Sequence, residues 1–235
     1  MRFKILALLL AALPHLAVAE DSPLRGINGE DVAFLTKNGG LAMAHKKGRT
    51  FLSTANGRYI VRGEYELYDR INKKVIRSFS DAKESVETFN FWNSEVLVVD
   101  AIQKLGRGSQ QFLVVASPYS SLEEIKALYS TMSSSITKSV YFLPTVHAGA
   151  HANEFVGAAL FVCDKNKVLE SGFPKEVKQD SVCKAGIQGV GASYAVSLAH
   201  EFNLDEKSLP VVVLPNGKKV FGEKNFVSLI NSFGE

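Results

Sequence analysis

The chain has 235 residues, of which 46% are hydrophobic, and a formal net charge of +3 at pH 7. A chain of this length can bury a sizeable core in one or two domains. So small a net charge gives no electrostatic reason to bind nucleic acid or an anionic membrane surface. The composition therefore favours a globular protein without a nucleic-acid partner.

The first 19 residues have the pattern of a secretory signal peptide. Arg2 and Lys4 precede the apolar run Ile5–Leu13, and Ala17-Val18-Ala19 offers small residues for cleavage after Ala19. The alternative is an uncleaved anchor, but the run is shorter than the roughly 20 residues that span a bilayer. Cleavage would leave 25 of the 27 Lys and Arg residues against 24 acidic residues. We therefore expect an exported mature protein of nearly zero net charge, without a membrane span.

Residues 20–79 are predicted to form a small β-rich N-terminal domain. Residues 20–48 are polar and glycine-rich, contain the basic stretch His45-Lys46-Lys47, and show no clear periodicity. From Phe51 onward β-branched and aromatic residues accumulate, and Asn56-Gly57 is a strong hairpin signal. The predicted strands are Phe51–Thr54, Tyr59–Tyr68 and Val75–Phe79.

Residues 80–108 are predicted to form a helical linker. Apolar residues recur there at steps of three and four, which is typical of one face of a helix. These residues are Val86, Phe89, Trp92, Val96, Val99 and Ile102. The glycines of Gly106-Arg107-Gly108 are expected to end the helix.

Residues 109–235 alternate strand and helix patterns, which indicates an α/β layer. The predicted strands are Gln111–Ala116, Ser139–Leu143, Val211–Leu214 and Lys219–Phe221. The predicted helices are Leu122–Met132, Asn153–Val162, Gly191–Phe202 and Phe226–Phe233. Two strands joined by a helix, then a helical insertion, a hairpin and a closing helix follow the order of a thioredoxin-like domain. The fold class expected for the whole chain is α+β.

The two cysteines of the chain, Cys163 and Cys183, are predicted to form a structural disulfide. An isolated pair in an exported protein is normally bonded, and closing a loop of about 20 residues is worth roughly 3 kcal/mol. The alternative is a redox-active pair, which usually has two residues between its thiols at the start of a helix. The observed spacing argues against that alternative.

Three stretches, in this order and spacing, resemble the DsbC/DsbG family of periplasmic disulfide isomerases. They are Asn56–Gly63, Cys163–Lys167 with Ser181–Cys183, and Leu209–Gly217. The resemblance implies a periplasmic homodimer joined through its N-terminal domain, and a Cys163–Cys183 structural disulfide. It also implies a cis-proline at Pro210 that faces the active site, where an ordinary trans proline is the alternative. Leu209 departs from the family, which has a small polar residue before that proline.

The active-site motif of that family, Cys-x-x-Cys at a helix start, is missing. The corresponding segment contains the degenerate site residues Ser117, Pro118, Tyr119, Ser120, Ser121 and Glu123. In one register Ser117 and Ser120 replace the two cysteines. In the other, which we favour, Ser120 and Glu123 replace them and form a capping box. Neither register contains a thiol, so this segment does not support thiol–disulfide exchange. A serine without an adjacent base is a poor nucleophile, so the segment offers no other catalytic residue.

A metal site is a weaker candidate. His147, His151 and Glu154 would share one face of a helix and could then ligate a metal. The intervening Ala148-Gly149-Ala150 favours a surface loop instead, so we predict no metal and no cofactor.

The sequence therefore predicts a redox-inactive, DsbC-like periplasmic protein that binds unfolded or assembling client proteins beside Leu209 and Pro210. It would act as a chaperone or assembly factor, and the resemblance includes members encoded with conjugation or secretion machinery. The alternative is a thiol–disulfide isomerase or reductase that uses Cys163 and Cys183. A third hypothesis is a regulator that binds one partner through the β-rich domain.

Overall fold

A computed structural model of the chain describes residues 32–35, 40–46, 49–54, 59–61, 66–174, 182–199, 202 and 204–234. The chain divides into two compact units, one of residues 1–67 and 75–86, the other of residues 68–74 and 87–235. The predicted signal peptide and the Asn56-Gly57 turn lie outside the described residues. Within the described ranges, every helix is too short or too polar to cross a membrane.

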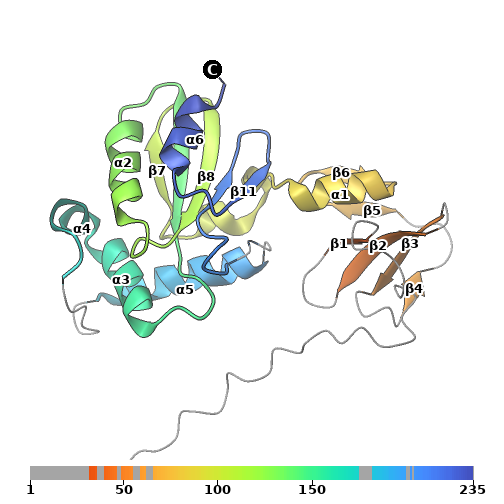
Figure 1. The fold of residues 1–235 in the computed structure, drawn as a ribbon, viewed down its shortest axis with the longest axis horizontal. Helices are drawn as coiled ribbons and strands as arrows, with labels where there is room; N and C mark the ends of the chain where they lie inside the picture. The colour runs from red at the N-terminus through yellow and green to blue at the C-terminus, as the bar shows by residue number, and fades with distance from the viewer. Residues whose placement is uncertain are drawn as a thin grey trace, which may run out of the picture. The chain divides into compact units, whose positions relative to one another are not determined.

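The smaller unit contains an antiparallel sheet with strand order β1-β2-β3-β4 (Figure 1). Its strands are β1 (Val32–Phe34), β2 (Leu41–Lys46), β3 (Arg49–Thr54) and β4 (Ile60–Val61). Its small core consists of Ala33, Met43, Leu52, Ile76 and Ala82. The strands β1 and β2 fall in the region where the sequence showed no periodicity, because short strands with small side chains such as Ala42 and Ala44 give little alternation.

Two predicted strands near the boundary of the units were wrong in their extent. The predicted strand Tyr59–Tyr68 is represented by β4 and by β5 (Leu67–Asp69), with residues 62–65 outside the described ranges. The strand β6 (Lys74–Ile76) pairs with β5, and Phe79 begins helix α1 (Phe79–Glu87) instead of ending a strand. The Asp81 carboxylate explains this start, since it accepts hydrogen bonds from the backbone N–H groups of Arg77 and Ser78.

The predicted helix over residues 80–108 was also wrong beyond Glu87. Two 3-10 helices follow, η2 (Phe91–Asn93) and η3 (Glu95–Val98), and then strand β7 (Gln103–Gly106). Phe89, Val96 and Val99 are buried one after another as the chain turns, so their spacing imitates a helix face, although Trp92 is 43% exposed. Polar side chains hold this segment in its turns, since Ser94 caps η3 and the Asn93 side chain donates to Ile71 O at 2.8 Å.

The larger unit is built on a five-stranded sheet with strand order β11-β10-β8-β9-β7 (Figure 1). Its other strands are β8 (Gln110–Ala116), β9 (Lys138–Pro144), β10 (Val211–Val213) and β11 (Lys219–Phe221). β8 and β9 are parallel, while β10 runs antiparallel to both β8 and β11, and β7 runs antiparallel to β9. The sheet and its helices give the chain a mixed helix and strand fold, as the sequence predicted.

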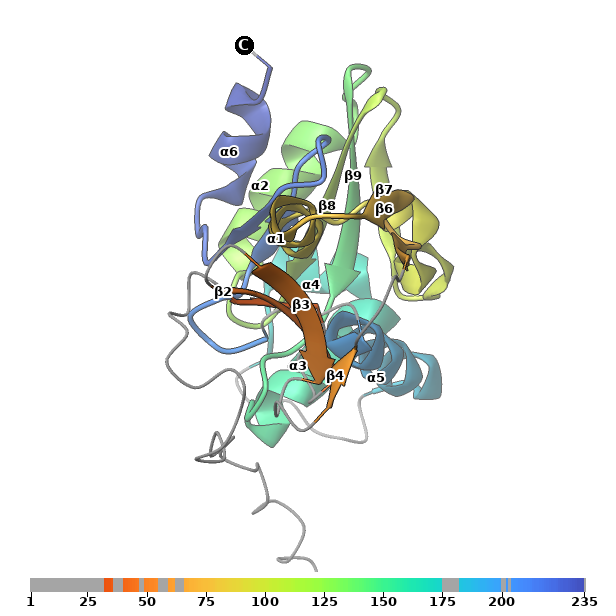
Figure 2. The ribbon, with the colours of Figure 1, turned by 90° about the vertical axis from the view of Figure 1, so that its right-hand side faces the viewer.

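Alternate residues of the central strands face two separate hydrophobic clusters. Phe112 and Val114 face the cluster that contains helices α2 (Leu122–Met132) and α6 (Phe226–Ser232). Leu113 and Val115 face the other cluster, which contains the buried residues of segment 89–101. Figure 2 shows α2 and α6 together on one side of this sheet. Burial on both faces explains the continuous apolar runs that predicted these strands.

The helical insertion consists of α3 (Ala152–Cys163), α4 (Lys165–Ser171) and α5 (Lys184–Ala199). The Cys163–Cys183 disulfide is present, with a Cα–Cα distance of 5.8 Å, and joins the end of α3 to the start of α5. The start predicted for α5, at Gly191, was seven residues too late. Glycine has a low helix propensity, so the glycines at the beginning of α5 argued against a helix there. Here Gly186 lets α5 approach α3: a Cβ on it would lie 2.3 Å from Ala159 O.

Candidate functional site

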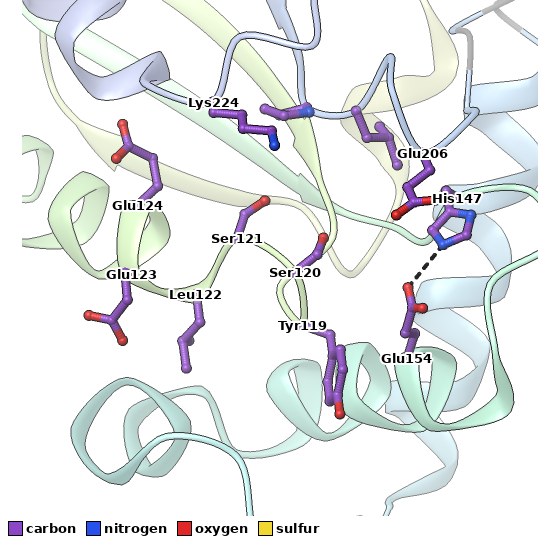
Figure 3. A pocket seen from close by; sticks show the side chains of 12 residues that line it. Tyr119, Ser120, Ser121, Leu122, Glu123, Glu124, His147, Glu154, Glu206 and Lys224 are labelled. Atoms are coloured by element: carbon purple, nitrogen blue, oxygen red, sulfur yellow. Dashed lines mark ion pairs between the residues drawn. The ribbon is translucent and has the colours of Figure 1, made fainter.

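A cleft of about 680 Å³ lies at the start of α2 (Figure 3). Four parts of the chain form its walls: the start of α2, the β9–α3 region, the loop before β10 and the segment after β11. Its lining consists of Tyr119, Ser120, Ser121, Leu122, Glu123, Glu124, His147, Glu154, Glu206, Leu209, Pro210 and Lys224. The structure therefore brings together most of the degenerate site residues and both of the predicted peptide-binding residues.

The start of α2 differs from the predicted capping box. The helix begins at Leu122 after Ser121, whose side chain makes no capping hydrogen bond. Ser120 therefore lies one residue before the capping position. The N–H of Ser121 donates to Ser117 O at 3.1 Å and tightens the turn that precedes the helix. Glu123 is 85% exposed and pairs with Lys126 at 3.0 Å instead of reaching back to Ser120. The favoured register was thus wrong in its capping geometry, while Ser120 and Glu123 both line the cleft.

Ser117 and Pro118 are buried and do not line the cleft. The Ser117 side chain is 1% exposed, and its hydroxyl has no hydrogen-bond partner among the described residues. Thr145 follows the adjacent parallel strand, and in the described part of the chain its buried hydroxyl also has no partner. The alternative register, with serines 117 and 120 in the place of two thiols, therefore does not present both hydroxyls to the cleft.

Leu209 and Pro210 form the wall of the cleft that faces the start of α2. The peptide bond between them is cis, as the family resemblance implies. Leu209 is 8% exposed, and its N–H donates to Asp205 O at 3.2 Å. Pro210 O accepts a hydrogen bond of 2.9 Å from Gly222 N, which anchors this wall to the end of β11. The wall is therefore apolar and fixed by backbone hydrogen bonds.

Tyr119 is the aromatic residue of the cleft. Its ring lies over α3 at Gly157, where a Cβ would come within 2.5 Å of Tyr119 Cδ2. The ring also contacts Phe173, with centroids 5.3 Å apart, yet Tyr119 remains 40% exposed. In Figure 3 its side chain points toward the helix that carries Glu154. A glycine on α3 thus fixes where this aromatic surface lies.

His147 and Glu154 form an ion pair in the cleft, with Nε2 and Oε2 3.2 Å apart. The other ring nitrogen, Nδ1, lies 3.0 Å from Ala148 O, which can only accept a hydrogen bond. Both ring nitrogens are therefore directed at oxygens of other residues and not at Ser120. Because the ring is held in this orientation, the pair is not placed to activate a serine nucleophile.

The metal hypothesis receives no geometric support. His151 precedes α3 at its capping position and does not line the cleft, so His147 and His151 do not share a helix face. Among the described residues, no three His, Cys, Asp or Glu side chains are arranged to hold a metal ion. The segment is the loop that the sequence favoured, with Ala150 N bonded to His147 O at 3.1 Å.

Sequence reasoning missed Glu124, Glu206 and Lys224. Glu124 accepts a hydrogen bond of 2.8 Å from Val227 N and thereby ties α2 to the start of α6. Glu206 and Lys224 reach the cleft from loops 18 residues apart in the chain, which carry no motif. The one available signal for Glu206 was its position shortly before Pro210.

The cleft thus offers an aromatic ring, an apolar wall, hydroxyls and carboxylates, but no thiol and no activated nucleophile. Both cysteines are joined in the disulfide and lie outside the lining. Such a set of groups can bind a ligand through van der Waals contact, hydrogen bonds and charge.

Comparison with known proteins gives distant structural likenesses among solved structures. No protein-family model matches the chain, and no curated protein sequence matches it. Among solved structures, DsbG of Helicobacter pylori is similar at 13% sequence identity with a TM-score of 0.33. The match covers 74% of this chain and 87% of that chain. The interpretation of the cleft therefore depends on the residues that line it.

Proposed function

We propose that this chain is a redox-inactive, thioredoxin-like binding protein that holds extended segments of client polypeptides in the cleft beside Leu209 and Pro210. One observation carries the proposal: the helix start that faces Pro210 bears Tyr119, Ser120 and Ser121, while both cysteines form a disulfide elsewhere. A ligand can be held there without covalent chemistry.

The strand order and directions of the larger unit support the thioredoxin-like assignment. The parallel pair β8 and β9 is joined through α2, and the antiparallel hairpin β10–β11 adds to the β8 side. The helix α6 then packs on the same face as α2. This succession is the one expected from the sequence, with α3, α4 and α5 as the insertion and β7 as an added edge strand.

The wider role that we propose is that of a homodimeric periplasmic chaperone or assembly factor. Residues 1–19 would be its signal peptide, residues 20–79 its dimerisation domain and residues 109–235 its client-binding domain. The smaller unit supports dimerisation, because its core has five buried apolar residues while Phe34, Tyr59 and Val61 are exposed. A second copy of the same sheet would cover such side chains.

The test is client binding by the mature protein, measured as suppression of aggregation of a chemically unfolded protein. Ser120→Arg would fill the cleft from an exposed position, whereas Ser130→Arg puts the same side chain on an exposed part of α2 outside the lining. We expect Ser120→Arg to lose most of the suppression and Ser130→Arg to retain it. Equal loss in both variants, or no suppression by the unaltered protein, would exclude the cleft as the client site.

An insulin-reduction assay separates this proposal from the isomerase alternative. We expect no reduction by the unaltered protein or by the Cys163→Ala/Cys183→Ala variant, since neither cysteine lines the cleft. Activity that is present in the unaltered protein and lost in the double variant would establish the isomerase or reductase alternative instead.

A further inference from the structure

We propose that Glu206 makes the cleft selective for client segments that carry a Lys or Arg side chain. This inference rests on the proposed function, since it concerns the ligand of the same cleft. It adds a specificity-determining residue and a chemical class of ligand, which the expectation of a general polypeptide-binding site does not contain.

The carboxylates of the cleft are not equally available. Glu123 pairs with Lys126, and Glu154 pairs with His147. Glu124 accepts the Val227 N–H. Among the described residues, Glu206 has neither an ion pair nor a side-chain hydrogen bond, although it is exposed and lines the cleft. Glu206 is therefore the carboxylate that a ligand can engage without breaking an existing interaction.

The cations of the cleft do not neutralise Glu206. His147 already faces Glu154 and Ala148 O with its two ring nitrogens. Lys224 lines the cleft without forming an ion pair with Glu206, and in Figure 3 its ammonium lies on the side of Ser121. Even with both cations charged, the four glutamates leave the lining net negative. A positively charged ligand group is therefore attracted to the cleft as a whole.

The loop holds Glu206 at a defined place relative to the apolar wall. Asp205 Oδ1 accepts hydrogen bonds from Lys207 N at 3.0 Å and Ser208 N at 2.7 Å, which fixes the turn on both sides of Glu206. Asp205 O accepts from Leu209 N, so the same turn leads directly into the Leu209–Pro210 wall. A segment that lies extended along this wall therefore passes the Glu206 carboxylate, which is placed to accept N–H donors from one of its side chains.

The inference is tested with fluorescein-labelled nonapeptides that differ at one central residue, Lys, Gln or Glu, in a neutral host sequence. Binding to the mature protein is followed by fluorescence anisotropy. We expect the Lys peptide to bind about threefold to fivefold more tightly than the Gln peptide, as a partly exposed ion pair allows, and the Glu peptide to bind most weakly. Raising the salt concentration should reduce the difference.

Two variants test whether Glu206 causes the preference for the Lys peptide. Glu206→Gln should bring the Kd of the Lys peptide close to that of the Gln peptide. Glu170→Gln removes the same charge from an exposed position of α4 outside the lining, and should keep the full preference. A preference that survives Glu206→Gln, or that Glu170→Gln removes equally, would overturn the role of Glu206.

The outcomes also distinguish this inference from the proposed function. Equal affinity for all three peptides, with binding still lost in Ser120→Arg, would overturn the charge selectivity and leave the client-binding cleft in place. Failure of every peptide to bind, whatever its charge, would overturn both.

Discussion

The cleft and the α3–α5 pair are two parts of the larger unit that differ in how accessible their residues are. Between α3 and α5, glycines bring two backbones together and a disulfide joins them. At the start of α2, serines and glutamates remain accessible around an apolar wall. The two cysteines thus join a helix pair, while the described lining of the cleft carries hydroxyls, carboxylates and an aromatic ring.

The largest effect on this comparison is expected from removing the disulfide. In Cys163→Ala/Cys183→Ala we expect the free energy of unfolding to fall by about 3 kcal/mol, since the bond closes a loop with a sequence separation of 20. Urea denaturation with and without reductant measures this. Peptide binding below the unfolding transition should be unchanged. A variant as stable as the parent, or one that folds normally and no longer binds, would contradict the separation of the two regions.

The next effect concerns the contact between α3 and α5. Gly186→Ala would put a Cβ 2.3 Å from Ala159 O and 2.4 Å from Cys163 Sγ, so we expect a loss of about 2 kcal/mol from overpacking. Gly191→Ala is the matched control on the same helix, because a Cβ there meets nothing within 4 Å. That control should gain about 0.5–1 kcal/mol through helix propensity. Equal effects of the two substitutions in urea denaturation would show that close packing is not the reason for Gly186.

A smaller effect is expected from the buried Thr145 hydroxyl, which has no hydrogen-bond partner among the residues that the structure describes. Thr145→Val keeps the shape of a buried side chain and removes a hydroxyl without a partner, so we expect a gain of about 1 kcal/mol. Ser139, on the strand β9 that precedes Thr145, is equally buried but donates to Gly108 O at 2.8 Å. Ser139→Ala should therefore lose about 1 kcal/mol. Thermal denaturation of both variants checks the opposite signs, and two losses would mean that Thr145 has a partner in solution.

The smallest change in stability is expected at Gly157, on the side of α3 that faces the cleft. In Gly157→Ala the new Cβ would meet the ring of Tyr119 at 2.5 Å, and the exposed ring can move away. The improved helix propensity offsets part of the cost, so stability should change by less than about 1 kcal/mol. Peptide affinity should change at least threefold. An unaltered affinity would remove Tyr119 from the binding surface.

The sequence predicted four of the five strands of the larger unit's sheet, β8 to β11, and missed the edge strand β7. The strands β8, β9 and β10 were readable because most of their residues are buried and give continuous apolar runs. The helix α2 was predicted with the observed bounds, Leu122–Met132. The segment 88–106 could not be predicted, since short turns that bury Phe89, Phe91 and Val96 in succession produce the same spacing as a helix. Tertiary packing likewise overrode the low helix propensity of Gly186.

The cleft joins residues that the sequence analysis singled out with residues that it missed. The segment 117–123 and Pro210 were singled out by the resemblance to the DsbC/DsbG family, and the structure brings Pro210 and most of that segment to one cleft, while their role in binding stays a prediction. The capping role of Ser120 was wrong by one residue, because a hydrogen bond from Ser121 N to Ser117 O displaces the helix start. Glu206 and Lys224 reach the cleft through long-range folding, and neither lies in a sequence motif; the proximity of Glu206 to Pro210 was the one available signal.

The hairpin β10–β11 has a consequence for the order in which this protein can fold during synthesis. Its strands fill the sheet on one side of β8, and Gly217 O at its turn accepts the N–H of Phe89, which opens the larger unit. These contacts join the first and last parts of that unit, so they form only after nearly the whole chain has been made. Until then the edge of β8 that pairs with β10 in the folded protein stays open.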